Sequence, residues 1–409
     1  MTSDSGEAPS QPPIARADAF AQGFLENPYP ALAFLRMATP AFHEESTDSW
    51  VIARARDVEA VLRSPQYGKD PRKVRTGVSV FASLNPDQGK EPSMLVLDPP
   101  DHTRLRGLVN KAFTPRVVEA LRPRVQQLVH ELLDAVAGQS GFDVMSALAA
   151  PLPITIIAEM IGVDPRDQEQ FRAWSHAFAA SLDALAQPET RQEAIQARDE
   201  ITAYFAGQIA AHRASPSDDL MSGLIAAQDG SDSLSTDEMI SVLTLLLVAG
   251  NVTTTDLIGN GVLALLQHPS ELQKLRDNPT MITNTVEEVL RYDSPVLGTG
   301  RVPLQDVEVS GCPIPKGEAV IVSLAAANRD PAATPDPERF DIGRQDVHHH
   351  SFGAGPHFCL GAPLARLEAP IAIGTLVERF PNLRLDPANP PQRRLLPAFR
   401  GLASLKVLI

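Results

Sequence analysis

The sequence has few of the residues that build secreted, membrane-spanning or nucleic-acid-binding proteins. Cysteine occurs twice in 409 residues, as Cys312 and Cys359. Two cysteines cannot make a disulfide framework, so we expect reduced thiols and a cytoplasmic protein. Aromatic residues make up 5% of the chain, which argues against a surface for stacking on bases. The longest strongly apolar stretch, 242–250, is far shorter than the roughly 20 residues of a membrane span.

Basic residues are also scarce relative to acidic ones, 36 against 50, and the net charge is −14. Such a chain repels polyphosphates and anionic lipids, so nucleic-acid binding and peripheral membrane binding are excluded as main functions. Residues 1–15 are predicted to form a disordered polar tail, because they lack the apolar segment of a signal peptide. We expect residues 16–409 to form a single domain that acts as a monomer, with a large core built from the 43% of apolar residues.

Helical periodicity dominates between residues 93 and 380. Strands are predicted at 50–53 and at 319–323, which follows a Pro-Lys-Gly turn, and the alternating segment 402–409 predicts another. The sequence thus indicates a mainly helical protein with a small β region, drawn from about 50–53, 296–323 and 390–409.

One long helix is predicted over residues 236–268. Ser235 and Glu238 have the spacing of a capping box, and no proline follows until Pro269. Such a helix is about 50 Å long and crosses a whole domain. Its apolar middle predicts burial, yet Gly250 and Thr253 lie in this same part. A polar turn in a buried helix suggests either local hydroxyl-to-carbonyl bonding or a functional site.

The strongest motif is Phe352-Gly-Ala-Gly-Pro-His-Phe-Cys-Leu-Gly361. Its three glycines allow tight turns and a close approach of the backbone to a ligand. A helix is predicted to begin after Gly361, with Pro363 in its first turn. Cys359 would then precede a helix N-terminus, which favours a thiolate. A single thiolate suits haem iron, because the porphyrin supplies four further nitrogen ligands. Cys312, without such surroundings, is predicted to be a small apolar core residue.

This decapeptide resembles the F-x-x-G-x-H-x-C-x-G loop of the cytochrome P-450 superfamily, and the chain is most similar to the soluble bacterial members. The resemblance implies a mainly α fold, a triangular helical prism with a small β region. It implies haem b, iron protoporphyrin IX, held between the long helix and the helix after Cys359, with Cys359 as the iron ligand. The cofactor-contacting residues implied by the motifs are Ala249, Phe352, Gly353 and Gly361.

Two further constellations match the family in chain order. His102 and Arg106 lie at i and i+4 of a predicted helix, and the resemblance implies that they bind the haem propionates together with Arg301 and His357. A guanidinium suits a carboxylate well. An E-x-x-R pair on one helix face, with an arginine downstream, resembles the family's structural triad that holds the cysteine loop; its members would be Glu288, Arg291 and Arg339.

The long helix contains Ala249-Gly-Asn-Val-Thr-Thr254, which resembles the segment where the family activates dioxygen. Thr253 matches the catalytic hydroxyl, but Val252 stands where the family carries the acid that supplies protons. We therefore expect protons to arrive through water, assisted by Asn251 or Asp256. The resemblance also predicts an apolar substrate pocket formed by Leu245, Val248 and Leu297.

The implied function is a haem-thiolate monooxygenase that hydroxylates an apolar small molecule with dioxygen. Electrons would come from NAD(P)H through a ferredoxin reductase and a ferredoxin, since no flavin or iron–sulfur segment is recognisable in the chain. Basic residues near the thiolate side would dock an acidic partner; the candidates are Arg104, Lys111 and Arg366.

Alternatives remain open at this point. In the first alternative the enzyme uses hydrogen peroxide directly. In the second it resembles the nitric-oxide reductases of this superfamily, which take hydride from NADH. The second alternative needs a basic loop, and Lys69, Arg72, Lys73 and Arg75 supply one, opposed by Asp70. A solvated face is the simpler interpretation of that run. A haem sensor or carrier is the non-enzymatic alternative.

The run His348–His350 does not favour a metal site, because consecutive side chains of an extended segment point to opposite faces.

Overall fold

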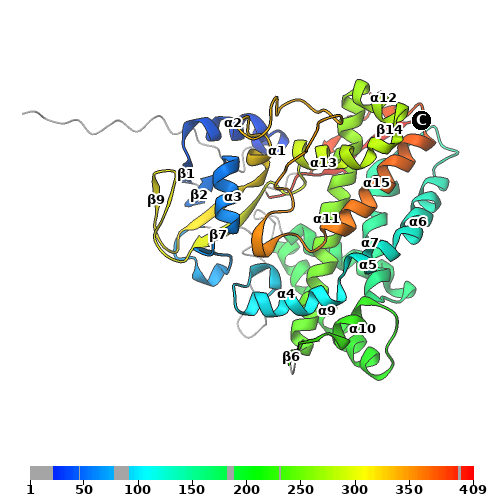
Figure 1. Cartoon of the computed structure of the whole chain (residues 1–409). Coiled ribbons are helices and arrows are strands. Elements are labelled where there is room, and N and C mark those ends of the chain that lie inside the picture. The colour runs from blue at the N-terminus through cyan, green and yellow to red at the C-terminus, as the bar shows by residue number, and fades with distance from the viewer. Residues whose placement is uncertain (1–21, 46, 78–91, 182–187, 230–231, 395–397) are drawn as a thin grey trace, which may run out of the picture.

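The long helix α11, Thr236–Gln267, runs through the middle of the structure, a computed structural model (Figure 1). The structure describes residues 22–45, 47–77, 92–181, 188–229, 232–394 and 398–409. The predicted polar tail, residues 1–15, lies outside these. Helix α11 begins with the predicted capping box: Ser235 Oγ accepts from the Glu238 amide at 3.1 Å, and Glu238 Oε2 accepts from the Ser235 amide at 2.8 Å. It ends one residue before the predicted end.

The described residues form fourteen further α-helices. They are α1 Gln22–Glu26, α2 Tyr29–Ala38, α3 Ala55–Arg63, α4 Asp101–Ala112, α5 Pro115–Ala120, α6 Arg122–Asp134, α7 Pro151–Ile161, α8 Gln168–Ser181, α9 Pro188–Ala214, α10 Leu220–Ala226, α12 Pro269–Asp277, α13 Ile282–Tyr292, α14 Leu324–Asn328 and α15 Ala362–Arg379.

The β region combines both ends of the chain, as predicted. Its main sheet has the order β1-β2-β10-β7-β3, and strand β2 pairs in parallel with β10, so that Trp50 lies beside Val320. In Figure 1 the blue strands from the N-terminal part lie beside the yellow strands from the later part. The strands of this sheet are β1 Ala41–Glu44, β2 Ser49–Ile52, β3 Tyr67–Gly68, β7 Gly298–Pro303 and β10 Ala319–Ser323.

The remaining strands form small sheets. The C-terminal segment makes two strands rather than one, and β14 pairs with both β11 and β4. Their bounds are β4 Gly141–Asp143, β5 Gln228–Asp229, β6 Asp232–Ser233, β8 Val307–Val309, β9 Cys312–Ile314, β11 Arg384–Leu385, β12 Gln392–Arg393, β13 Leu402–Ser404 and β14 Lys406–Leu408.

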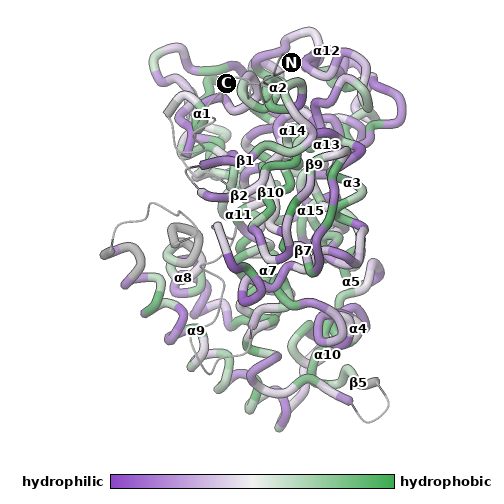
Figure 2. Tube along the Cα trace, turned by 90° about the vertical axis from the view of Figure 1, so that its left-hand side faces the viewer, coloured by the Kyte–Doolittle hydropathy of each residue, from purple (hydrophilic) through white to green (hydrophobic). Residues whose placement is uncertain are grey.

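The main hydrophobic core lies around α11, and the outer helices turn one apolar face toward it. Helix α9 is an example: its buried residues recur every three or four positions, at Ala194, Ala197, Ile201, Phe205 and Ile209. Figure 2 shows hydrophilic and hydrophobic positions alternating along α9. Within the described residues, α11 is long and apolar enough to span a membrane, but 67% of its most apolar window is buried in the protein. It is therefore a core helix.

Helix α15, which follows the cysteine loop, packs closely against α11. A Cβ added to Gly261 of α11 would lie 2.7 Å from Ile373 of α15. This contact sets the distance between the later halves of the two helices. The middle of α11 and the start of α15 lie on either side of a cavity. The space between them forms the candidate site.

Candidate active site

A cavity of about 600 Å³ lies between the middle of α11, the start of α15 and the cysteine loop. Helix α4, strand β7 and the loop after β3 close its sides. All nine residues predicted to bind the haem or its iron line it: His102, Arg106, Ala249, Arg301, Phe352, Gly353, His357, Cys359 and Gly361. Sequence positions as far apart as 102 and 361 thus converge on one space.

Cys359 lines the cavity, and this is the space to which it is exposed. Its amide donates to the Phe352 carbonyl at 2.9 Å, which closes the loop predicted from the glycine spacing. Burial raises the pKa of the thiol, while the N–H groups of Gly361 and Ala362 at the start of α15 and the Arg106 guanidinium lower the pKa. These groups stabilise a negative sulfur, as expected at a helix N-terminus.

One corner of the cavity collects positive charge. The His102 and His357 rings lie 4.0 Å apart, and Arg106 donates to the Phe358 carbonyl at 2.9 Å. Burial, Arg106 and Lys69 together lower the pKa of His102 to about 4, and burial lowers the pKa of Arg301 to about 10. In both groups burial disfavours the charged form, which a bound anion would favour.

These residues fit a haem. Among the described lining residues Asp237 is the sole carboxylate, and it lies twelve positions before Ala249 along α11, or about 18 Å away. The buried Nδ1 of His102 has no hydrogen-bond partner. A flat apolar group with two carboxylates and a metal would match the apolar walls, the cationic corner and the thiolate in one molecule.

The polar residues of α11 do not all face this cavity. Thr253 does, and its hydroxyl donates to the Ala249 carbonyl at 3.0 Å. Asn251, predicted to assist proton delivery, instead donates to Ser175 Oγ of α8 at 2.9 Å and does not line the cavity. Helical geometry explains this, because a step of two residues turns a side chain by about 200°.

The prediction for Asp256 is also wrong in its placement. Asp256 is fully buried and pairs with Arg394, which donates to its Oδ2 at 2.6 Å. Burial raises the pKa of this carboxyl to about 7, and Arg394 opposes that shift. A Cβ on Gly401 would lie 1.8 Å from Asp256 Oδ1, so the carboxyl is directed at the β12–β13 segment and not at the cavity.

Two of the three predicted pocket residues line the cavity, namely Leu245 and Val248, but Leu297 does not. Leu297 packs in a separate cluster with Tyr29 of α2. Its neighbour Val296, which bridges Phe399, faces the cavity instead. Successive residues of an extended segment point to opposite sides, so an error of one position reverses the side chain.

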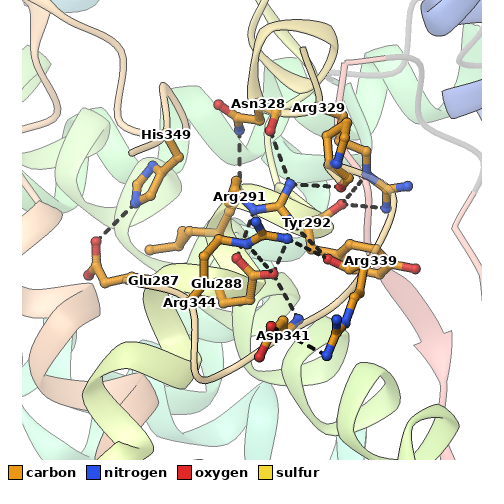
Figure 3. A network of polar contacts seen from close by, with 12 residues as sticks. Glu287, Glu288, Arg291, Tyr292, Asn328, Arg329, Arg339, Asp341, Arg344 and His349 are labelled. Atoms are coloured by element: carbon orange, nitrogen blue, oxygen red, sulfur yellow. Dashed lines mark hydrogen bonds and ion pairs between the residues drawn. The ribbon is translucent and has the colours of Figure 1, made fainter. Parts of the chain in front are cut away.

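The Glu288–Arg291 pair is fully buried and bidentate, with distances of 2.7 and 2.8 Å (Figure 3). The third predicted member, Arg339, does not contact Glu288 with its side chain, which is 62% exposed. Arg344 takes that place: its Nε lies 3.4 Å from Glu288 Oε1. Arg339 contributes its carbonyl, which accepts from Arg291 at 3.1 Å and from Arg344 at 3.1 Å.

Further residues, missed from the sequence, tie this network to the cysteine loop. Asn328 accepts from the His350 amide at 2.6 Å and donates to Ser351 Oγ at 2.8 Å. Glu287 contacts His349 at 3.0 Å and binds Arg366 through two hydrogen bonds of 2.7 Å (Figure 3 shows the first of these contacts). Nothing in the local sequence marks Asn328 or Arg344, because both act through partners that are distant in the chain.

Several of the basic residues predicted to dock a redox partner or to bind NADH have acidic partners within the protein. Arg366 pairs with Glu287, and Arg104 contacts Asp232 and Glu238; their side chains are only 40% and 36% exposed, which limits their use as docking charges. In the basic loop, Arg72 pairs with Asp70 at 2.6 Å and Lys73 with Asp98 at 2.7 Å. The loop predicted for NADH binding therefore has carboxylate partners of its own.

The helical architecture, the thiolate and the cationic corner define a haem-thiolate protein. The sequence profile of the family described as Cytochrome P450 matches residues 40–402. The chain is 42% identical to the cytochrome P450 monooxygenase PikC of Streptomyces venezuelae over 408 residues, 97% of this chain and 95% of that protein. It is 44% identical to cytochrome P450 CYP107DY1 of Priestia megaterium over 346 residues, 82% and 84% of the two chains.

Among solved structures, P450BioI in complex with an acyl carrier protein ligated to hexadec-9Z-enoic acid superimposes with a TM-score of 0.87 and 38% identity, covering 95% of this chain and 99% of that chain. The chain belongs to the cytochrome P450 family, and it is a monooxygenase of the bacterial type.

Proposed function

We propose that the enzyme hydroxylates a small molecule whose reacting end is apolar, with electrons delivered from NAD(P)H by a ferredoxin and its reductase. The observation that carries this proposal is the apolar wall beside Cys359. Leu245, Val248 and Ala249 of α11 face the cavity there, and Val296 and Phe399 face it from the β region. Apolar contacts of this kind exclude water and bind a hydrocarbon group, but they do not select one particular compound.

The other end of the cavity supports a polar group on the substrate. Ser241 and Thr244 of α11 and Thr202 of α9 line it, and Thr244 lies nine positions before Thr253, or about 13 Å along the helix. Hydroxyl groups of this kind suit a substrate that carries a hydroxyl or keto oxygen away from its reacting carbon. The substrate class is therefore amphipathic, with its apolar end toward the thiolate.

When bound, the haem supplies the reductive activation of dioxygen and the transfer of one oxygen atom, and the thiolate of Cys359 favours O–O cleavage. The protein contributes orientation and proton handling. Thr253 holds its hydroxyl in the cavity through its bond to the Ala249 carbonyl, so it can hydrogen-bond a water molecule there. Val252 contributes an apolar surface, and no carboxylate of the described residues lines this part of the cavity. We infer that water at Thr253 carries the proton.

For the ferredoxin, the best-supported docking surface is a cleft between α2, α3 and the cysteine loop. Its lining includes Phe358, next to Cys359, and the arginines of α3. Arg56 and Arg63 are 78% and 62% exposed there, although each has an acidic neighbour on its own helix. A partner with a negative patch would meet these charges directly beside the loop that carries the thiolate.

The decisive test of the function is ferredoxin-dependent turnover. Apolar compounds that bear one oxygen function, tested in aromatic, terpenoid and macrolide series, should displace iron-bound water and then be hydroxylated with stoichiometric oxygen uptake. Cys359→Ser should abolish the thiolate-type spectrum of the reduced carbon-monoxide complex. Binding without product under ferredoxin-driven reduction would favour a carrier, and nitric-oxide consumption with NADH alone would favour the reductase alternative.

The docking surface is tested by the rate of the first electron transfer. Arg63→Glu should slow reduction by ferredoxin and leave substrate binding unchanged. Arg166→Glu is the matched control, because Arg166 is also exposed and paired with a nearby aspartate, but lies in the α7–α8 segment. Equal rates for both variants would remove the cleft from consideration.

A further inference from the structure

The loop after strand β3 brings a buried lysine to the cationic corner of the cavity. Strand β3 pairs antiparallel with β7, with Tyr67 opposite Pro303 and Gly68 opposite Val302. Lys69 directly follows β3 and Arg301 lies on β7, and both residues line the same corner of the cavity. The Asp98 carboxylate opposes the lowering of the pKa of each of these two residues.

The position of Lys69 is fixed by Asp98, just before the start of α4. The Lys69 amide donates to Asp98 Oδ1 at 2.6 Å, and Lys73 Nζ donates to Oδ2 at 2.7 Å. A Cβ on Gly68 would lie 2.4 Å from Asp98 Oδ2, so the backbone approaches this carboxylate closely. The carboxylate of Asp98 therefore holds the loop.

The Lys69 side chain is buried, with 9% of the residue exposed, and lines the cavity with Arg301, His102 and His357. Burial and Arg301 lower the pKa of Lys69, whereas Cys359 and Asp98 oppose this shift. Lys69 also lowers the pKa of His357, second only to burial. The corner thus contains one basic residue more than the four that the sequence motifs predicted.

We propose that Lys69 binds a propionate carboxylate of the haem, as a fifth anchoring residue beside His102, Arg106, Arg301 and His357. The bound carboxylate separates Lys69 from Arg301 and so stabilises the β3–β7 pairing and the loop that leads to α4. This inference rests on haem being the cofactor, and it gives the first member of the basic run a role in cofactor retention instead of nucleotide binding.

The test is the rate at which the ferric holoenzyme loses haem to excess apomyoglobin. Lys69→Met should lose haem about tenfold faster, because a hydrogen bond to a charged group is removed from a buried site. Lys69→Arg keeps the charge and should stay close to the wild-type rate. Lys316→Met, which removes an exposed lysine near the same sheet, is the control and should not change the rate.

A second arm separates propionate binding from a general structural role. When loaded with haem dimethyl ester, whose propionates carry no charge, the wild type and the Lys69→Met variant should lose the cofactor equally fast. Equal rates for wild type and Lys69→Met with ordinary haem would overturn the proposal, as would a tenfold difference that persists with the ester. Absence of a thiolate-type carbon-monoxide spectrum in the wild type would instead overturn the haem assignment itself.

Discussion

Glu288 is held by two arginines, and the choice of the second one decides which substitution harms the cysteine loop. Arg344 reaches Glu288 and also donates to the Pro335 carbonyl at 2.7 Å and the Asp336 carbonyl at 3.1 Å. Among the described residues, the Arg339 side chain pairs with Asp341, at 3.6 Å. The E-x-x-R spacing could be predicted because both partners share one helix turn. The third member could not, since it depends on how an irregular loop folds back.

We predict that Arg344→Ala lowers the free energy of unfolding by roughly 1.5–3 kcal/mol, because it removes one of the two guanidinium groups that face the buried Glu288 carboxylate. Arg339→Ala should cost less than about 1 kcal/mol, since its ion pair is exposed. Urea unfolding of the two holoproteins, together with their haem content, measures the difference. If Arg339→Ala proved the more damaging change, the assignment of the third member would be wrong.

Glu368 of α15 has both carboxyl oxygens buried and without a hydrogen-bond partner. Burial raises the pKa of Glu368 from its usual 4.5 to about 8, so it is protonated in the folded protein at pH 7. The unfolded chain releases this proton at lower pH. The contribution of Glu368 to stability is therefore greatest below pH 4.5, declines as the pH rises toward 8, and is constant above that.

We predict that Glu368→Gln removes this decline, so that the variant gains stability relative to wild type between about pH 5 and 8. Thermal unfolding of both proteins across that range measures it. Glu378→Gln changes an exposed glutamate on the same helix and should leave the pH dependence of the wild type intact. Parallel curves for wild type and Glu368→Gln would show that the carboxyl is ionised in the folded state.

The cysteine loop as an element is fixed by its packing as well as by its hydrogen bonds. Gly353 and Gly355 both have positive φ, +68° and +70°. A Cβ on Gly353 would meet nothing closer than the His357 carbonyl at 3.8 Å, whereas one on Gly355 would lie 2.6 Å from the Leu62 carbonyl at the end of α3. The loop is therefore pressed against α3 at one glycine and open at the other.

Alanine at Gly355 incurs the left-handed backbone penalty of about 1–2 kcal/mol and also collides with backbone. We predict that Gly355→Ala displaces the loop and yields protein with much less of the thiolate-type carbon-monoxide spectrum. Gly311→Ala is the matched control and should retain the spectrum, because Gly311 also has a positive φ, +88°, but a Cβ there meets nothing within 4 Å and the residue does not line the cavity. Similar losses in both variants would mean that backbone strain alone lowers the spectrum.

Long elements could be predicted closely and side-chain directions less so. The helix over 236–268 and the strand over 319–323 were confirmed to within one residue, because capping, proline placement and alternation are local properties. Leu297 and Asp256 were misplaced, because one step along an extended segment, or three along a helix, depends on tertiary packing. Short strands such as β4 gave no local signal, since only three residues pair there.

For the molecule as a whole, the cavity is the place where distant segments meet, and four of them bring basic side chains. Lys69 follows β3, His102 and Arg106 lie on α4, Arg301 on β7 and His357 in the cysteine loop. The apolar core around α6 and α7, in contrast, has no contact with the cavity except at Ile157 of α7. Removing the cofactor should therefore affect these two parts of the protein unequally.

We predict that the apoprotein exchanges its backbone amides faster than the holoprotein in segments 67–73, 101–113, 298–303 and 352–361, and at nearly the same rate in α6. The reason is that the basic side chains of the first three segments lose the propionates that bind them, and the cysteine loop loses the iron, while the core of α6 keeps all its contacts. Hydrogen exchange followed by mass spectrometry on both forms measures this directly. A uniform acceleration that includes α6 would show instead that the haem stabilises the fold as one cooperative unit, and faster exchange limited to 352–361 would confine its influence to the iron ligand.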